Sequence, residues 1–147
     1  MTEPTPALRL RVRGGAPALR PAAARVTAAV MDRGVPPDRA AAIELAVHEL
    51  LANALEHGHL GDPSRPIEVE VTGAERGVVT VRVTDQALGG GWPRRCPTEV
   101  PSPAALRGRG LTLARSAGAE LGVTSAARGT EVVLRLSTLP APGLHTH

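Results

Sequence analysis

Runs of alternating apolar and polar residues predict three β-strands, at residues 8–14, 67–73 and 78–85. The second and third runs are joined only through Ala74–Gly77, so we expect them to form an antiparallel hairpin. Two closing strands are predicted near the C-terminus, on either side of a turn at Arg128–Gly129. These closing strands cover residues 121–127 and 130–137.

Apolar residues recur at helical spacing in two segments that precede the hairpin. The first helix is predicted at residues 18–33. The second opens at the sequence VPPDR, where Asp38 favours the helix dipole, and continues to about His57, with Gly58 as the residue that ends it. A third, glycine-led helix is predicted at Gly108–Ala119.

This order of elements predicts an α+β fold. We expect a two-layer sandwich in which one mixed, mostly antiparallel sheet is covered on one face by helices. One domain is predicted over residues 7–138, with disordered ends at residues 1–6 and 139–147. Residues 86–107 form a stretch rich in Gly and Pro, and a loop of this length inside a compact domain is either functional or disordered.

The composition excludes several classes of protein. With one Trp and no Phe or Tyr, the core must be aliphatic. One cysteine, Cys96, excludes an internal disulfide and a multi-cysteine metal site. No run of about 18 apolar residues is present, and the N-terminus lacks the apolar segment of a signal peptide. We therefore expect a cytoplasmic protein that makes no contact with a membrane.

All 17 basic residues are Arg, and the formal net charge is +3. The arginines are scattered and aromatic residues are nearly absent, so direct nucleic-acid binding is a weak hypothesis. Without Lys, the chain has neither a P-loop nor the strand Lys of a eukaryotic-type protein kinase. Any bound nucleotide phosphates must therefore be held by backbone amides, a metal and Arg.

A single polar pair stands at the edge of the apolar stripe of the second helix. Glu49 and Asn53, at positions i and i+4, lie on one helical face. The stripe itself consists of Ile43, Val47, Leu50, Leu51 and Ala54. The pair is either a solvated helix edge, which spacing alone favours, or half of a metal and proton-transfer site.

Three shorter motifs follow this helix, and each has an ordinary explanation as a strand end or a turn. They are Asp85 with Leu88–Gly91, then Gly108–Leu111, then Gly129–Thr130. Together with the sequence AVHELLANALEHG at residues 46–58, their order and spacing resemble the Bergerat-fold ATPases of the GHKL superfamily. Within that superfamily the chain resembles the bacterial anti-sigma-factor serine/threonine kinases, over residues 8–137.

The resemblance implies a site for MgATP. Asn53 would bind Mg²⁺ through its carbonyl oxygen, a hard ligand suited to this ion. Glu49 would accept the proton of an attacking serine hydroxyl. Asp85 would accept a hydrogen bond from the adenine amino group, with the hydroxyl of Thr130 nearby.

The other implied nucleotide contacts come from the glycine motifs and the arginines beside them. They are Ala87, Gly89, Arg107, Gly108, Arg109, Gly110 and Leu111. Gly108 and Gly110 would let the backbone approach phosphate at a helix N-terminus, and Arg107 or Arg109 would supply positive charge. Residues 86–107 would cover the nucleotide as a lid.

Ala87 departs from the family pattern, because the first glycine motif has Gly at this position. Its methyl group would narrow the adenine pocket or block a positive φ angle. The resemblance as a whole implies a homodimeric protein kinase that phosphorylates Ser or Thr of a small anti-sigma-factor antagonist, and it extends to binding of a sigma factor. The alternative is an ATP-binding regulatory module that acts by protein-protein binding, and a weaker one is the detached ATP-binding half of a histidine kinase.

Overall fold

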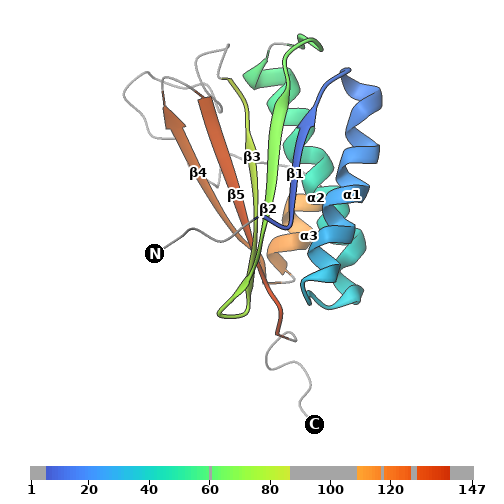
Figure 1. The fold of residues 1–147 in the computed structure, drawn as a ribbon, viewed down its shortest axis with the longest axis vertical. Coiled ribbons are helices and arrows are strands. Elements are labelled where there is room, and N and C mark those ends of the chain that lie inside the picture. The colour runs from blue at the N-terminus through green and yellow to red at the C-terminus, as the bar shows by residue number, and fades with distance from the viewer. Residues whose placement is uncertain (1–5, 60, 87–108, 117, 127–128, 140–147) are drawn as a thin grey trace.

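The computed structural model describes residues 6–59, 61–86, 109–116, 118–126 and 129–139. Within these residues, five strands form one sheet in the order β1-β2-β3-β5-β4, and every pair of neighbours is antiparallel (Figure 1). The strands are β1 (Leu8–Val12), β2 (Ile67–Glu75), β3 (Val78–Thr84), β4 (Glu120–Ala126) and β5 (Gly129–Ser137). Because β3 and β5 are antiparallel neighbours, the end of β3 lies beside the start of β5.

Rows of aliphatic side chains cross one face of all five strands. One row follows the strand register through Leu10, Val69, Val83, Val132 and Val123. The next row contains Leu8, Val71, Val81, Leu134 and Leu121. The members on β2, β3 and β5 are all buried. Since side chains alternate between the two faces of a strand, this register turns the polar residues to the opposite face.

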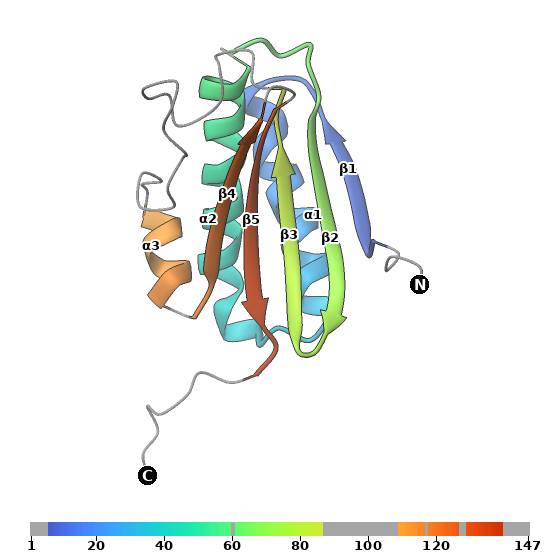
Figure 2. The ribbon, with the colours of Figure 1, turned by 90° about the vertical axis from the view of Figure 1, so that its left-hand side faces the viewer.

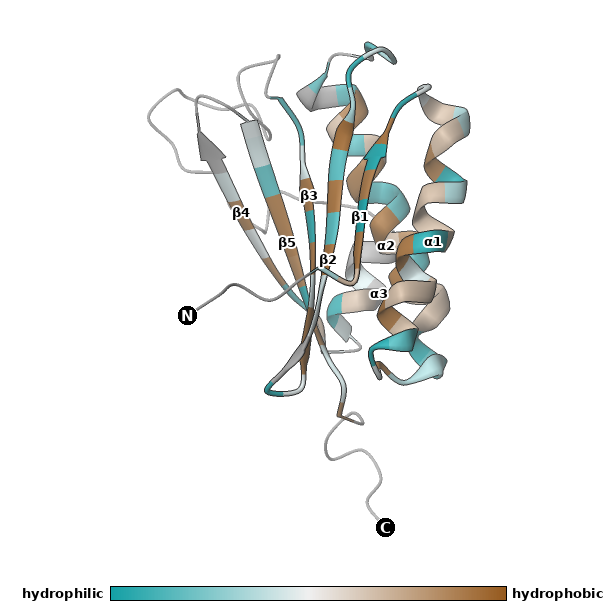
Figure 3. Ribbon diagram, in the orientation of Figure 1, coloured by the Kyte–Doolittle hydropathy of each residue, from teal (hydrophilic) through white to brown (hydrophobic). Residues whose placement is uncertain are grey.

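The opposite face of the sheet carries charged side chains. Arg9 Nη2 lies 3.0 Å from Glu70 Oε2, and Arg82 Nε lies 3.9 Å from Glu131 Oε1. Figure 3 shows the resulting alternation of apolar and polar residues along the strands. Only the apolar face therefore needs a covering layer.

Helices supply that layer on one face of the sheet (Figure 2). They are α1 (Leu19–Asp32), α2 (Ala40–Asn53) and α3 (Arg109–Ser116). α2 packs against both α1 and α3 and is the middle helix. Its buried residues, Ile43, Ala46, Val47, Leu50 and Leu51, follow helical spacing. Short 3-10 turns precede the two long helices, η1 (Ala16–Ala18) before α1 and η2 (Pro37–Arg39) before α2.

The predicted α+β sandwich is confirmed, although no parallel strand pair occurs among the described residues. The first strand ends at Val12, because Gly14 and Gly15 both take positive φ angles and turn the chain out of the sheet. The predicted loop at 86–107, apart from Gln86, and the predicted tail beyond Leu139 lie outside the described residues.

The second predicted helix also differs from expectation at its C-terminal end. Regular α-helix stops at Asn53, and the next residues form a π-helical turn, η3 (Ala54–Gly58). The amide of His59 closes this wider turn by donating a hydrogen bond to the carbonyl oxygen of Ala54 at 2.9 Å. π-Helical turns often occur at functional sites. Here the turn leads directly to a buried histidine.

Arg39 connects the start of α2 to the end of β5 through two hydrogen bonds. Its side chain is buried, with Nη1 donating to the carbonyl oxygen of Ser137 at 2.9 Å and Nη2 donating to that of Leu139 at 2.8 Å. The guanidinium group therefore donates to the last carbonyl of β5 and to a second carbonyl two residues beyond that strand.

Candidate functional site

Glu49 and Asn53 are both half-buried on α2, at the border of its buried stripe as the hydrophobic pattern predicted. Asn53 is the last residue of the regular helix and directly precedes the π-helical turn. The carboxylate and the amide are therefore carried by the C-terminal half of α2. That end of the helix lies at the same end of the molecule as the end of β3 and the start of β5 (Figure 2).

Asp85 and Thr130 meet where β3 ends and β5 begins. The amide of Asp85 donates to the carbonyl oxygen of Thr130 at 3.0 Å, and the amide of Thr130 donates to Asp85 Oδ1 at 3.4 Å. Both side chains are buried, with 5% of Asp85 and 1% of Thr130 exposed. The structure thus brings together two residues that were predicted from motifs 45 positions apart.

Gly129 is required at this junction for a steric reason. A Cβ atom placed on it would collide with the backbone carbonyl oxygen of Asp85. The glycine therefore lets the two strands approach closely at the point where Asp85 leaves the sheet.

His59 is a buried residue of this region that the sequence analysis did not identify. Its side chain is completely buried, and its Nε2 accepts a hydrogen bond from the amide of Gln86 at 2.9 Å. Nε2 therefore carries no proton, and the proton of the neutral ring is on Nδ1. Nδ1 makes no hydrogen bond of good geometry within the part of the chain that the structure describes.

Burial lowers the pKa of His59 below its ordinary value, because desolvation penalises the charged ring. The carboxylate of Asp85 and the backbone of Arg65 lie near enough to oppose this lowering of the pKa without cancelling it. The neutral imidazole is therefore the form that the fold favours. No sequence signal marked this histidine, since HLGDPSRP is predicted only as a loop by its composition.

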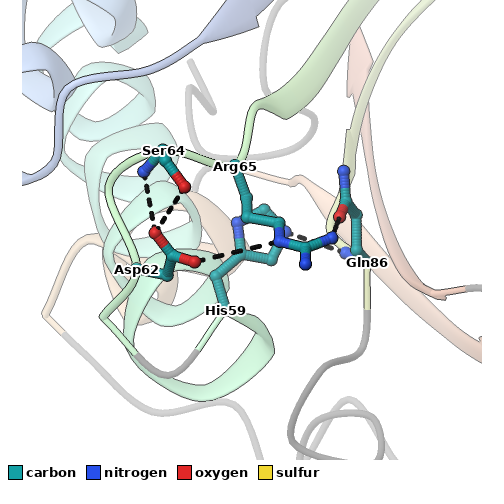
Figure 4. Close-up of polar contacts among 5 residues, drawn as sticks. All are labelled: His59, Asp62, Ser64, Arg65 and Gln86. Atoms are coloured by element: carbon teal, nitrogen blue, oxygen red, sulfur yellow. Dashed lines mark hydrogen bonds and ion pairs between the residues drawn. The ribbon is translucent and has the colours of Figure 1, made fainter.

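The loop that follows His59 also reaches Gln86 (Figure 4). Arg65 Nη1 donates to Gln86 Oε1 at 3.0 Å, and Arg65 Nε lies 3.8 Å from Asp62 Oδ2. Asp62 Oδ1 in turn accepts hydrogen bonds from the hydroxyl and the amide of Ser64, which lower the pKa of Asp62. The backbone of Gln86 is therefore held by His59 and its side chain by Arg65.

The remaining predicted contacts are only partly described. Arg109, Gly110 and Leu111 form the first turn of α3, which ends at Ser116, three residues before the predicted end at Ala119. The others lie outside the described residues: Ala87, Gly89, Arg107 and Gly108.

Asn53 fits a magnesium ion that takes most of its ligands from elsewhere. No group of three or more His, Cys, Asp or Glu side chains able to hold a metal occurs among the described residues. A Mg²⁺ ion bound by one amide oxygen would need nucleotide phosphates and water as its other ligands, which is its usual behaviour.

In the described part of the chain, no helix has the length and apolar character needed to cross a membrane.

A groove of about 450 Å³ also lies between α1 and α2. Its described lining residues are Arg20, Ala23, Ala41, Glu44, Leu45 and His48. None of these is a predicted nucleotide contact, so the groove belongs to a different part of the surface.

The sequence matches one protein family over most of its length. Residues 15–136 match the histidine kinase-like ATPase domain. The chain belongs to this family. It is therefore an ATP-binding domain of the histidine kinase-like type, and its helices packed on one antiparallel sheet are consistent with the Bergerat fold.

Solved structures share this fold. The RsbU and RsbW domains of a Mycobacterium tuberculosis protein are 24% identical over 88% of this chain and 32% of theirs, with a TM-score of 0.55. The histidine kinase domain of a blue-light activated histidine kinase from Erythrobacter litoralis is 26% identical over 82% of this chain and 63% of its own, with a TM-score of 0.53. The histidine kinase-like domain thus spans less than two thirds of either of these two chains.

A chain of the SiaB–SiaC complex from Pseudomonas aeruginosa has 12% identity and a TM-score of 0.51, over 88% of this chain and 87% of its own. No match to a curated protein reaches significance. The similarity to these solved structures shows that this protein shares their fold.

Proposed function

We propose that this histidine kinase-like ATPase domain binds MgATP and phosphorylates a Ser or Thr of a small antagonist protein, as an anti-sigma-factor-type kinase in a partner-switching pathway. The observation that carries the proposal is the buried pairing of Asp85 with Thr130 at the β3–β5 junction. A buried carboxylate at the edge of the sheet is a hydrogen-bond acceptor, and an amino group such as that of adenine is a suitable donor to it.

Glu49 is the proposed general base. Its carboxylate, half-buried on α2, would take the proton of the substrate hydroxyl as that oxygen attacks the terminal phosphate of ATP. Asn53, one turn further along α2, would hold Mg²⁺ through its amide oxygen. The metal, when bound, neutralises charge on the phosphates.

The phosphates are proposed to lie at the N-terminus of α3. Arg109 and Gly110 begin this helix, where backbone N–H groups without intrahelical partners favour an anion. Because the chain has no Lys, the side chain of Arg107 or Arg109 is the proposed source of positive charge, and Ala87, Gly89, Gly108 and Leu111 are the further proposed contacts.

Two of the comparisons support a protein partner for this chain. The M. tuberculosis structure includes an RsbW domain, and the P. aeruginosa structure is a complex of two proteins. These likenesses support an antagonist protein as the substrate of this chain. A homodimer and the binding of a sigma factor are proposed from the resemblance to anti-sigma-factor kinases.

A second function is favoured by one residue. Ala87 stands where the family motif has Gly, and a narrowed adenine pocket would weaken nucleotide binding. In that case the domain would be a regulatory module that acts by binding a partner, with little or no phosphotransfer.

Calorimetric titration of MgATP into the wild type and the Asp85→Asn variant tests the proposal. We expect saturable binding that Asp85→Asn weakens by about tenfold or more, because the amide presents a donor where the carboxylate presents an acceptor. Asp38→Asn, at an exposed position of η2, is the matched control and should bind as the wild type does. Absence of binding by a folded wild type would contradict the proposal.

Labelled ATP and a candidate antagonist then separate the two functions. Transfer of label to a Ser or Thr of the antagonist supports the kinase. Saturable ATP binding without any transfer supports the regulatory module.

A further inference from the structure

The peptide group between Asp85 and Gln86 is held from both sides. On one side, its N–H, which belongs to Gln86, donates to His59 Nε2 at 2.9 Å. On the other side, its carbonyl oxygen, which belongs to Asp85, packs so closely on Gly129 that no Cβ fits between them. The amide of Asp85 is held as well, by the carbonyl oxygen of Thr130 at 3.0 Å.

These contacts fix the direction in which Asp85 projects. A side chain can point constantly in one direction only if the backbone that carries it keeps its φ and ψ angles. Thr130 and Gly129, both from β5, restrain the Asp85 backbone on the sheet side. His59 supplies the restraint from the helix layer, at the point where the chain has left β3.

We propose that His59 is a positioning residue of the nucleotide site, whose Nε2 orients Asp85 for the adenine amino group by holding the amide of Gln86. This inference rests on the proposed function of Asp85. It also accounts for the π-helical turn. That turn ends in the hydrogen bond from the His59 amide to the Ala54 carbonyl oxygen, and it places the buried imidazole beside the amide of Gln86.

The chemistry requires an acceptor at Nε2. A neutral imidazole with its proton on Nδ1 provides one, and burial keeps the ring neutral by lowering the pKa of His59. Protonation would place an N–H of the ring against the N–H of Gln86 and remove the hydrogen bond. The charged groups that face the ring are Asp85 at the end of β3, and Asp62 and Arg65 in the loop before β2.

Two variants of His59 separate the acceptor from the bulk of the side chain. His59→Gln keeps an acceptor of similar reach, whereas His59→Leu keeps apolar volume and has no acceptor. We expect His59→Leu to bind MgATP roughly tenfold more weakly than the wild type, the effect of one lost hydrogen bond to a positioned amide, and His59→Gln to stay within about threefold. Thermal unfolding without nucleotide shows that each variant is folded under the conditions of the titration.

The pH dependence of MgATP affinity gives a readout that a purely structural role would not change. As the pH falls below about 6.5, the ordinary pKa of histidine, the wild type should lose affinity as His59 takes up its proton, beyond any loss seen in His59→Gln. Protonation of ATP and of the other side chains is common to both proteins. The difference between the two profiles therefore isolates His59, and this comparison decides the question even where His59→Leu does not fold.

The outcomes distinguish this inference from the proposed function. Binding that is lost in Asp85→Asn but unchanged in folded His59→Leu, or identical pH profiles of the wild type and His59→Gln, would overturn the role of His59 and leave the nucleotide site in place. A folded wild type without any MgATP binding would overturn both. Weaker binding in His59→Leu, with recovery in His59→Gln, supports the positioning role.

Discussion

The backbones of Asp85 and Thr130 are joined by a hydrogen bond of 3.0 Å, from the Asp85 amide to the Thr130 carbonyl oxygen, and the Asp85 side chain lies against the Thr130 amide. This pairing extends the β3–β5 ladder by one residue beyond the last paired residue of β3, Thr84. The proposed adenine contact is therefore carried by a continuation of the sheet.

Gly129→Ala should disrupt this junction. The new methyl group would collide with the carbonyl oxygen of Asp85, and neither backbone can move without breaking the ladder between β3 and β5. We expect the free energy of unfolding to fall by about 2–3 kcal/mol, as for other overpacked sites, and MgATP affinity to fall with it.

Gly122→Ala, in β4, is the control for this substitution. Its new Cβ would lie 3.6 Å from Arg135 Nη1, the end of a flexible side chain, so only a small change is expected. Urea unfolding of both variants measures the difference. Equal stability of the two variants would contradict the steric role assigned to Gly129.

Glu49→Gln should separate binding from phosphotransfer. The amide is close to the carboxylate in shape but cannot accept the proton of a substrate hydroxyl, so we expect a rate of transfer to the antagonist about 10²–10⁴-fold lower with MgATP affinity nearly unchanged. Glu44→Gln, on the same helix, should transfer at the wild-type rate. A Glu49→Gln variant that transfers as fast as Glu44→Gln would rule out Glu49 as the base.

Arg39→Met should loosen the end of β5. The substitution leaves the carbonyl oxygens of Ser137 and Leu139 without the donors that now serve them. We expect a loss of about 1–3 kcal/mol in the free energy of unfolding, the range for hydrogen bonds from charged groups, with the cost of burying the charge partly offsetting it. Arg25→Met, at an exposed position of α1, should change stability little, and urea denaturation compares the two variants.

Stability should fall as the pH drops below the ordinary pKa of histidine. Because the pKa of His59 is lowered in the fold, the unfolded chain takes up its proton at a higher pH than the folded chain does. The contribution of His59 is therefore complete above about pH 6.5 and is lost progressively down to its folded pKa.

The free energy of unfolding, measured from about pH 8 to about pH 5 in the wild type and in His59→Gln, checks this effect. The wild type should lose more stability than the variant over this interval, since the variant has no titrating group at residue 59. Parallel curves for the two proteins would show that His59 does not titrate differently in the fold.

Much of the fold was predictable because its signals are local. The valine-rich hairpin, for example, alternates with period two over β2 and β3, and this alternation alone decides which side chains meet the helices. Glu49 and Asn53 were predictable as a half-buried pair for the same reason, since helical spacing places both at the border of one apolar stripe.

His59 could not be predicted in this way. Its burial depends on a π-helical turn and on contact with Gln86, which lies 27 residues away. No periodic pattern marks a single residue that leaves a helix and packs against the end of a strand. The buried Arg39 was missed for a similar reason, because its partners, Ser137 and Leu139, are about a hundred residues further along the chain.

By itself, the sequence determined the elements, the aliphatic core and the family, because these depend on periodicity, composition and the order of motifs. Which polar groups meet depends instead on the packing of the folded chain. The antiparallel pairing of β3 with β5 joins Asp85 to Thr130, and the turn after α2 brings His59 to Gln86. Contacts of this kind depend on distances between segments far apart in the chain, which are set by how the sheet and the helices pack together.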